Sequence, residues 1–162
     1  MSTSTLPSAR RQIGLIVATF AMVGVALGAV GFVTVDWART QFVTAATGSN
    51  PATFGPVFVA LSTFQTTVTL FFAAPVLAAA LGLLSGSRFA VPTVAAGVAA
   101  AGALIGFFVM TGVGLVGLSL PSGAGTGQTY ALGGAVGPLL LSGVATAVTG
   151  GVAGALGSLF VR

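Results

Sequence analysis

Three long stretches without a charged side chain constrain the fold of this chain more than any other feature: residues 12–35, 40–87 and 89–161. The hydrocarbon core of a bilayer is about 30 Å thick, and about 20 apolar helical residues cross it. The 162 residues include only five basic side chains and one acidic side chain, too few for the surface of a soluble domain. The mean hydropathy of +1.12 is likewise too high for a soluble domain. The sequence therefore predicts an integral membrane protein covered by the lipid bilayer.

Changes in hydropathy along these stretches divide the chain into four predicted spans. The second stretch opens with polar residues and becomes largely apolar only after Pro56. The third is too long for one span, and its hydropathy falls where Pro121, Gln128 and several Gly and Ser residues gather, which favours a loop. We expect transmembrane helices over about residues 12–35, 57–84, 90–118 and 135–161.

These spans predict an all-α fold, an integral membrane four-helix bundle with antiparallel neighbours. A single transmembrane domain is expected over residues 12–162, after a flexible polar N-terminal tail over residues 1–11. The outer loops are expected over about residues 36–56 and 119–134. The link between the second and third helices has room only for a tight turn, so these two helices should be neighbours.

The arginines and two aromatic residues predict how the bundle lies in the membrane. Four of the five arginines fall on one side of the predicted topology: Arg10, Arg11, Arg88 and Arg162. Because cytoplasmic flanks carry the positive excess, both termini are expected in the cytoplasm of a multi-pass protein of the cell (plasma) membrane. Trp37 and Tyr130 then fall at the outer interface, where amphipathic rings are favourable, and are predicted to be interface anchors.

The residue types that carry most enzymatic chemistry are missing. The chain has no Cys, His, Lys or Glu, and its one acidic side chain is Asp36. Thiolate and imidazole chemistry, Schiff bases and most metal ligands are therefore absent. We expect no enzyme activity, no catalytic, cofactor-binding or metal-binding residue, and no cofactor. The net charge of +4 comes from separated arginines instead of a clustered basic face, so no nucleic acid partner is expected.

Small residues recur at intervals of four in three of the predicted helices, which is typical of helices that pack closely in lipid. The first and third helices each carry a Gly-x-x-x-Gly motif, and the fourth carries a longer stripe. The predicted helix-packing face consists of Gly24, Gly28, Gly102, Gly106, Ser142, Thr146, Gly150, Gly154 and Ser158. Packing within the bundle is the favoured interpretation, and contact with a homo-oligomer or with other membrane subunits is the alternative.

The second predicted helix differs because polar side chains occupy one of its faces. Ser62, Gln65, Thr66 and Thr69 share that face at about 100° per residue. Its simpler role is hydrogen bonding between helices and back to carbonyls of the same helix. The sharper hypothesis is a path for a small neutral or weakly ionic solute, with Gln65 as the main contact. Pro75 in the same helix predicts a kink.

No sequence motif assigns a specific activity, and three classes of function remain. The favoured class is a structural or accessory membrane subunit that acts by helix packing, because this explains the missing chemistry. A passive channel or transporter of a small neutral or weakly ionic solute is the alternative, motivated by the polar face of the second helix. A membrane enzyme is the least favoured class.

Overall fold

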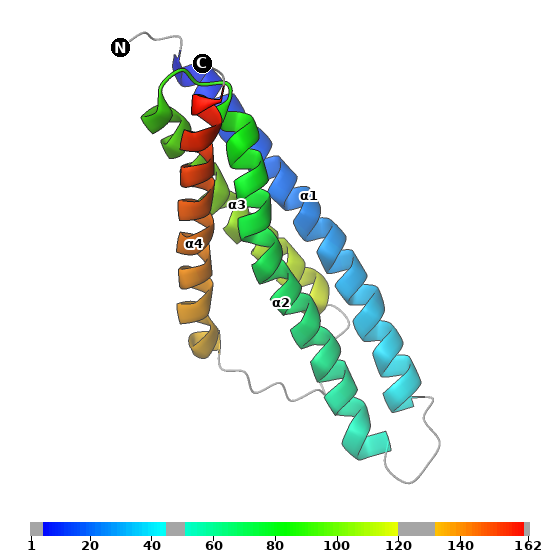
Figure 1. The fold of residues 1–162 in the computed structure, drawn as a ribbon. Helices are drawn as coiled ribbons and strands as arrows, with labels where there is room; N and C mark the ends of the chain where they lie inside the picture. Colours follow the sequence, from blue (N-terminus) through cyan, green and yellow to red (C-terminus); the bar gives the residue numbers. More distant parts are fainter. Residues whose placement is uncertain (1–4, 45–50, 120–131, 161–162) are drawn as a thin grey trace.

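The computed structural model describes residues 5–44, 51–119 and 132–160. These residues form four α-helices and no strands, so the predicted all-α fold is confirmed. The helices are α1 (Thr5–Arg39), α2 (Pro51–Gly86), α3 (Pro92–Ser119) and α4 (Leu132–Leu159) (Figure 1). A five-residue π-helical turn, η1 (Thr40–Thr44), continues α1. All four helices are long and apolar enough to cross a membrane.

The predicted N-terminal tail over residues 1–11 is corrected by the structure. Helix α1 already begins at Thr5, and residues 1–4 lie outside the described part of the chain. The residues between Thr5 and Gln12 include Ser8 and two arginines and lie outside the apolar run, so hydropathy alone placed the helix start too late. Polar residues that follow a helical path outside an apolar span leave no mark in a hydropathy pattern.

The predicted outer loop over residues 36–56 is also mostly helical. Helix α1 and η1 continue through Thr44, and α2 already begins at Pro51. Thr40 contributes to this continuation, because its hydroxyl donates a hydrogen bond of 2.9 Å to the Asp36 carbonyl one turn earlier. Pro51 occupies the first helical position, where its missing N–H is not needed. At the other predicted outer loop, over residues 119–134, Ser119 ends α3 and residues 132–134 already belong to α4. Residues 120–131 lie outside the described ranges.

The four helices differ in length. Helices α1 and α2 have 35 and 36 residues, whereas α3 and α4 have 28 each. At a rise of 1.5 Å per residue these lengths correspond to about 53 Å and about 42 Å. The far ends of α1 and α2 extend past the end of α4 in Figure 1. The molecule therefore has one even end and one end where the first two helices project.

The even end gathers the start of α1, the end of α4 and the link between α2 and α3 (Figure 1). This link is a tight turn, as predicted, and backbone hydrogen bonds close it. The Arg88 N–H donates to the Ser85 carbonyl at 3.1 Å, and the Phe89 N–H donates to the Gly86 carbonyl at 3.0 Å. Pro92 then opens α3, again at a first helical position.

Each helix packs against two or three of the others. Helix α3 contacts the other three helices, and α2 does the same, whereas α1 and α4 share no contact within the described ranges. The largest completely buried side chains are Phe20, Leu70, Phe107 and Met110. Phe107 packs near Phe71 of α2 and Gly143 of α4. The interior of the bundle is therefore a packed core of large apolar side chains.

Candidate functional site

The closest helix pair, α1 and α3, is joined by small residues. Four successive contacts advance by four residues on both helices: Ile16 with Gly102, Phe20 with Gly106, Gly24 with Met110, and Gly28 with Gly114. Because both numbers increase together, the two helices run parallel. A Cβ atom at Gly24 would lie 2.7 Å from the Met110 carbonyl oxygen, so only glycine permits this approach.

Helix α4 uses its small residues in the same way against two neighbours. A Cβ atom at Gly154 would lie 2.8 Å from the Ala95 carbonyl oxygen of α3, and one at Gly150 would lie 2.9 Å from the Ala103 Cβ. From α2, Gly82 and Gly86 approach the backbone of Gly150 and Gly154. The stripe also includes Thr146 and Ser158, which are buried, and Ser142, which is partly buried. The glycines of the predicted helix-packing face thus lie against helices of the same chain.

The predicted polar path along α2 consists of Ser62, Gln65, Thr66 and Thr69. Its hydroxyl groups donate to carbonyls of α2 itself: Ser62 to Phe58 at 2.9 Å, Thr66 to Ser62 at 3.0 Å, and Thr69 to Gln65 at 2.9 Å. Gln65 is exposed on the outer surface, whereas Thr66 is partly buried with its methyl group near Gly31 of α1. The four side chains therefore lie on one side of α2 at its boundary with α1, with Gln65 and Thr69 exposed and Ser62 and Thr66 partly buried.

Of the two predicted interface anchors, Trp37 lies in the described part of the chain and Tyr130 does not. Trp37 lies near the projecting end of α1, with 57% of its surface exposed, and its ring packs edge-on against Phe42 at a centroid distance of 5.9 Å. Phe42 in turn stacks on Phe58 of α2 at 4.6 Å. This aromatic contact ties η1 to α2. Tyr130 lies outside the described residues.

An apolar groove of about 520 Å³ runs between α1 and α2 in the middle of the molecule. Its lining includes Val23 and Leu27 from α1, and Phe72 and Leu77 from α2. Thr69 is its one hydroxyl-bearing residue, and that hydroxyl is already bonded to the Gln65 carbonyl. The groove therefore offers shape and apolar contact but little polar recognition.

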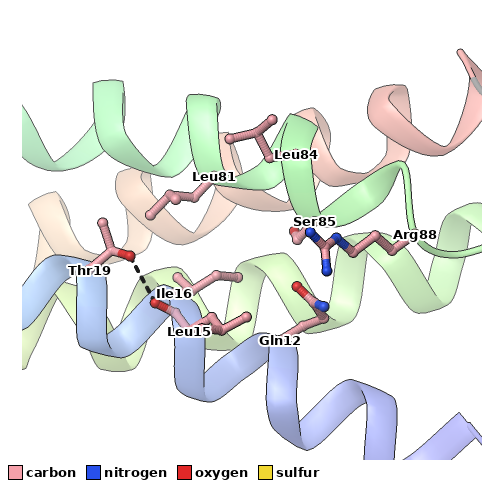
Figure 2. A pocket seen from close by; sticks show the side chains of 8 residues that line it. All are labelled: Gln12, Leu15, Ile16, Thr19, Leu81, Leu84, Ser85 and Arg88. Carbon is pink, nitrogen blue, oxygen red and sulfur yellow. Dashed lines mark hydrogen bonds between the residues drawn. The ribbon is translucent and has the colours of Figure 1, made fainter.

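A second, smaller pocket of about 140 Å³ opens between the same two helices at the even end. Figure 2 shows three polar side chains converging there: the Gln12 amide from α1, the Ser85 hydroxyl near the end of α2, and the Arg88 guanidinium from the following turn. Leu15 and Leu81 are among the residues that line the other end (Figure 2). The Thr19 hydroxyl at that end is already bonded to the Leu15 carbonyl at 2.9 Å. The pocket thus has a polar end and a mainly apolar end, and we call it the Gln12 pocket.

Gln12 is a mostly buried residue whose amide opens onto the pocket without a protein partner among the described residues. Only 8% of the residue surface is exposed, and no hydrogen bond joins its side chain to another residue that the structure describes. Ser85 is 4% exposed, and its hydroxyl makes a long bond of 3.2 Å to the Gly82 carbonyl. The Arg88 side chain is exposed and likewise bonds to no residue in the described ranges. The polar end therefore presents unused donors.

Buried amides normally have hydrogen-bond partners, because an unsatisfied polar group loses its hydration without compensation. The donors of Gln12 and Arg88 together suit an acceptor that carries negative charge. The sequence analysis did not identify this site, since Gln12 and Arg88 were assigned only to the ends of spans. Gln12 and Arg88 come together because α1 and α2 pack side by side, and no local sequence pattern predicts this contact.

Comparisons with protein families, with curated proteins and with solved structures found no match to this chain. The site must therefore be interpreted from its own residues.

Proposed function

We propose that this chain is a multi-pass integral membrane protein that acts as a structural or accessory subunit, through packing instead of catalysis. The observation that carries the proposal is the division between its inner and outer surfaces. Glycines allow close contacts between the helices around a few large buried side chains, whereas many other large apolar side chains point outward. The most exposed of these include Phe72, Val76, Leu141 and Phe160. Such a surface is suited to lipid or to the helices of another membrane subunit.

The proposed topology places the even end in the cytoplasm and the projecting end of α1 and α2 outside. Arg10, Arg11 and Arg88 all lie at the even end, and Arg39 lies toward the other end of α1. The excess of basic residues at one end supports this orientation by the positive-inside rule. The exposed Trp37 near the projecting end suits the opposite interface. The cell membrane is the proposed location.

The polar face of α2 gives less support to transport. The hydroxyls of Ser62, Thr66 and Thr69 already donate to their own helix, and Gln65 points outward. The bundle interior is filled by Phe20, Leu70, Phe107 and Met110, so it offers no wide polar route within the described helices. We therefore keep the accessory role as the proposed function.

Membrane insertion and topology can be tested together, because the chain contains no cysteine. Single cysteines at Ser87 and at Gln41 should place one thiol at each end of the bundle. In intact cells, an impermeant maleimide should label Gln41→Cys and leave Ser87→Cys unlabelled until the membrane is opened. Both variants should remain in the membrane after alkaline carbonate washing. Extraction by carbonate would contradict insertion, and the reverse labelling pattern would contradict only the orientation.

The accessory role is tested by reconstitution and by native purification. Vesicles that contain the purified protein should release glycerol and urea no faster than protein-free vesicles. Faster release that is lost in Gln65→Leu would instead support the solute path. Purification in native lipid nanodiscs should retain a second copy or another membrane protein on the outer faces of the helices. A monomer that carries only lipid would contradict the subunit role.

A further inference from the structure

We infer that the Gln12 pocket binds the phosphate group of an anionic phospholipid, whose hydrocarbon chain lies along the seam between α1 and α2. This inference rests on the membrane insertion proposed above. It assigns a specific ligand to residues that the accessory role does not use. Three features support it: the Gln12 amide and the Arg88 guanidinium line the pocket without a side-chain partner among the described residues, positive charge is in local excess, and the pocket is polar at one end and mainly apolar at the other.

The donors at the polar end match the oxygens of a phosphate. The Gln12 amide offers two N–H groups, and the Arg88 guanidinium offers a fork of N–H donors that fits phosphate geometry. Ser85 can turn its hydroxyl away from the Gly82 carbonyl, to which it bonds at only 3.2 Å. Figure 2 shows these three groups facing the same space. A phosphate there would accept from the Gln12 amide, which lines the pocket and has no partner among the described residues.

The electrostatic environment favours an anion over a neutral ligand. Arg10 and Arg11 lie within one turn of Gln12, and Arg88 lines the pocket itself. The one acidic side chain of the chain, Asp36, is 24 residues further along α1. That separation is about 36 Å along a helix, well beyond the Debye length of about 8 Å at physiological ionic strength. No carboxylate side chain near the pocket therefore competes with an external anion.

The apolar end of the pocket favours a lipid over a soluble phosphate. Leu15 and Leu84 also line the pocket and are 50% and 67% exposed, so a hydrocarbon chain can cover them. Further along the same two helices, the apolar groove begins at Leu77. Arg88 and Leu77 are 11 residues apart, which is about 16 Å along a helix and close to half of a hydrocarbon core of about 30 Å. One lipid chain therefore spans from the polar pocket to the start of the groove.

The test is native mass spectrometry of the full-length protein in detergent, titrated with phosphatidylglycerol, phosphatidylcholine or inorganic phosphate. We expect one phosphatidylglycerol to bind per protein, with an affinity about tenfold higher than that of phosphatidylcholine, because Arg88 recognises the net negative charge of the lipid. Arg88→Gln should weaken this binding by about tenfold, and Gln12→Leu by several fold. Arg10→Gln is the matched control and should weaken binding much less, because it removes the same charge from an exposed residue that contributes only to the general field outside the pocket.

The outcomes distinguish a bound lipid from general attraction to basic residues and from a soluble anion. Equal loss of binding in Arg88→Gln and Arg10→Gln would mean general attraction to a basic surface and would overturn the site. Displacement of the lipid by millimolar inorganic phosphate, dependent on Arg88, would assign the pocket to a soluble anion and overturn the lipid assignment. The carbonate and labelling experiments report membrane insertion separately. A protein that stays inserted but shows no preference for phosphatidylglycerol would refute this inference alone.

Discussion

Gly154 illustrates how closely single residues determine the packing of this bundle. A side chain there would meet the Ala95 carbonyl and the Ala99 Cβ of α3, both closer than 3.0 Å. We expect Gly154→Leu to lower the free energy of unfolding in detergent by about 3 kcal/mol, the upper end of the usual cost of overpacking a tight interface. Gly137→Leu is the control on the same helix, since nothing lies within 4 Å of a Cβ there.

The same pair of variants decides between the two interpretations of the small-residue stripe. Reversible unfolding followed by circular dichroism should show a lower midpoint for Gly154→Leu and a nearly unchanged midpoint for Gly137→Leu. The molecular mass in detergent should stay the same for both. A change of oligomeric mass in Gly154→Leu without loss of stability would show that this residue faces a second chain instead.

Thr111 offers the opposite kind of variant. It is 2% exposed on α3, and its hydroxyl has no hydrogen-bond partner among the described residues. Thr111→Val removes an unsatisfied polar group at nearly constant volume, so we expect a gain in stability of about 1 kcal/mol. Thr146 is the matched control, because its equally buried hydroxyl donates to the Ser142 carbonyl at 2.7 Å. Thr146→Val should lose about 1 kcal/mol in the same assay.

A stabilised Thr146→Val together with a destabilised Thr111→Val would contradict this assignment of the two hydroxyls. That result would indicate that the Thr111 hydroxyl has a hydrogen-bond partner outside the described residues. The two residues were not equivalent in the sequence analysis either. Thr146 was recognised because it belongs to a stripe of small residues at intervals of four, whereas nothing in the pattern around Thr111 indicates that its hydroxyl lacks a hydrogen bond.

Helix α2 and the turn η1 depend on a contact at Gly55. A Cβ atom there would collide with the Phe42 carbonyl and lie 2.9 Å from a Val43 methyl carbon. Gly55→Ala should therefore push η1 away and break the stack between Phe42 and Phe58. The single tryptophan, Trp37, contacts Phe42 and reports this change directly.

We expect the Trp37 emission of Gly55→Ala to shift and its anisotropy to fall relative to the unmodified protein. Gly112→Ala is the control, since a Cβ there meets nothing within 4 Å. Identical Trp37 spectra in the two variants would contradict the docking of η1 on α2. The expected effect on global stability is modest, because the contact lies at the projecting end and outside the main core.

The elements themselves were predictable in number and type but less so in length. Long apolar runs are sufficient to identify a helix, because few other structures can bury a backbone in such surroundings. The ends were missed where polar residues continue the helix, as at Thr5 and Thr40. The meeting of Gln12 with Arg88 was also unpredictable, because it depends on how α1 and α2 align in space.

The arrangement of the four helices pairs elements that are distant in the sequence. Helix α1 runs parallel to α3, and the contacts of Gly82 and Gly86 with Gly150 and Gly154 make α2 parallel to α4. The hydropathy pattern predicted antiparallel neighbours, and it contains no information on which parallel pair is tight. Two Gly-x-x-x-Gly motifs mark α1 and α3 as packing helices, but 25 glycines in the chain make such motifs weakly specific.

This pairing has a consequence for biogenesis. With the membrane insertion proposed above, a ribosome delivers α1 and α2 to the membrane before α3 and α4 exist, and the glycine face of α1 is then exposed to lipid until α3 arrives. Helices insert individually and associate afterwards, so the first hairpin must wait in the bilayer as an incomplete surface. A fragment that ends after α2 would therefore expose the glycine face of α1, and only the insertion of α3 would bury that face.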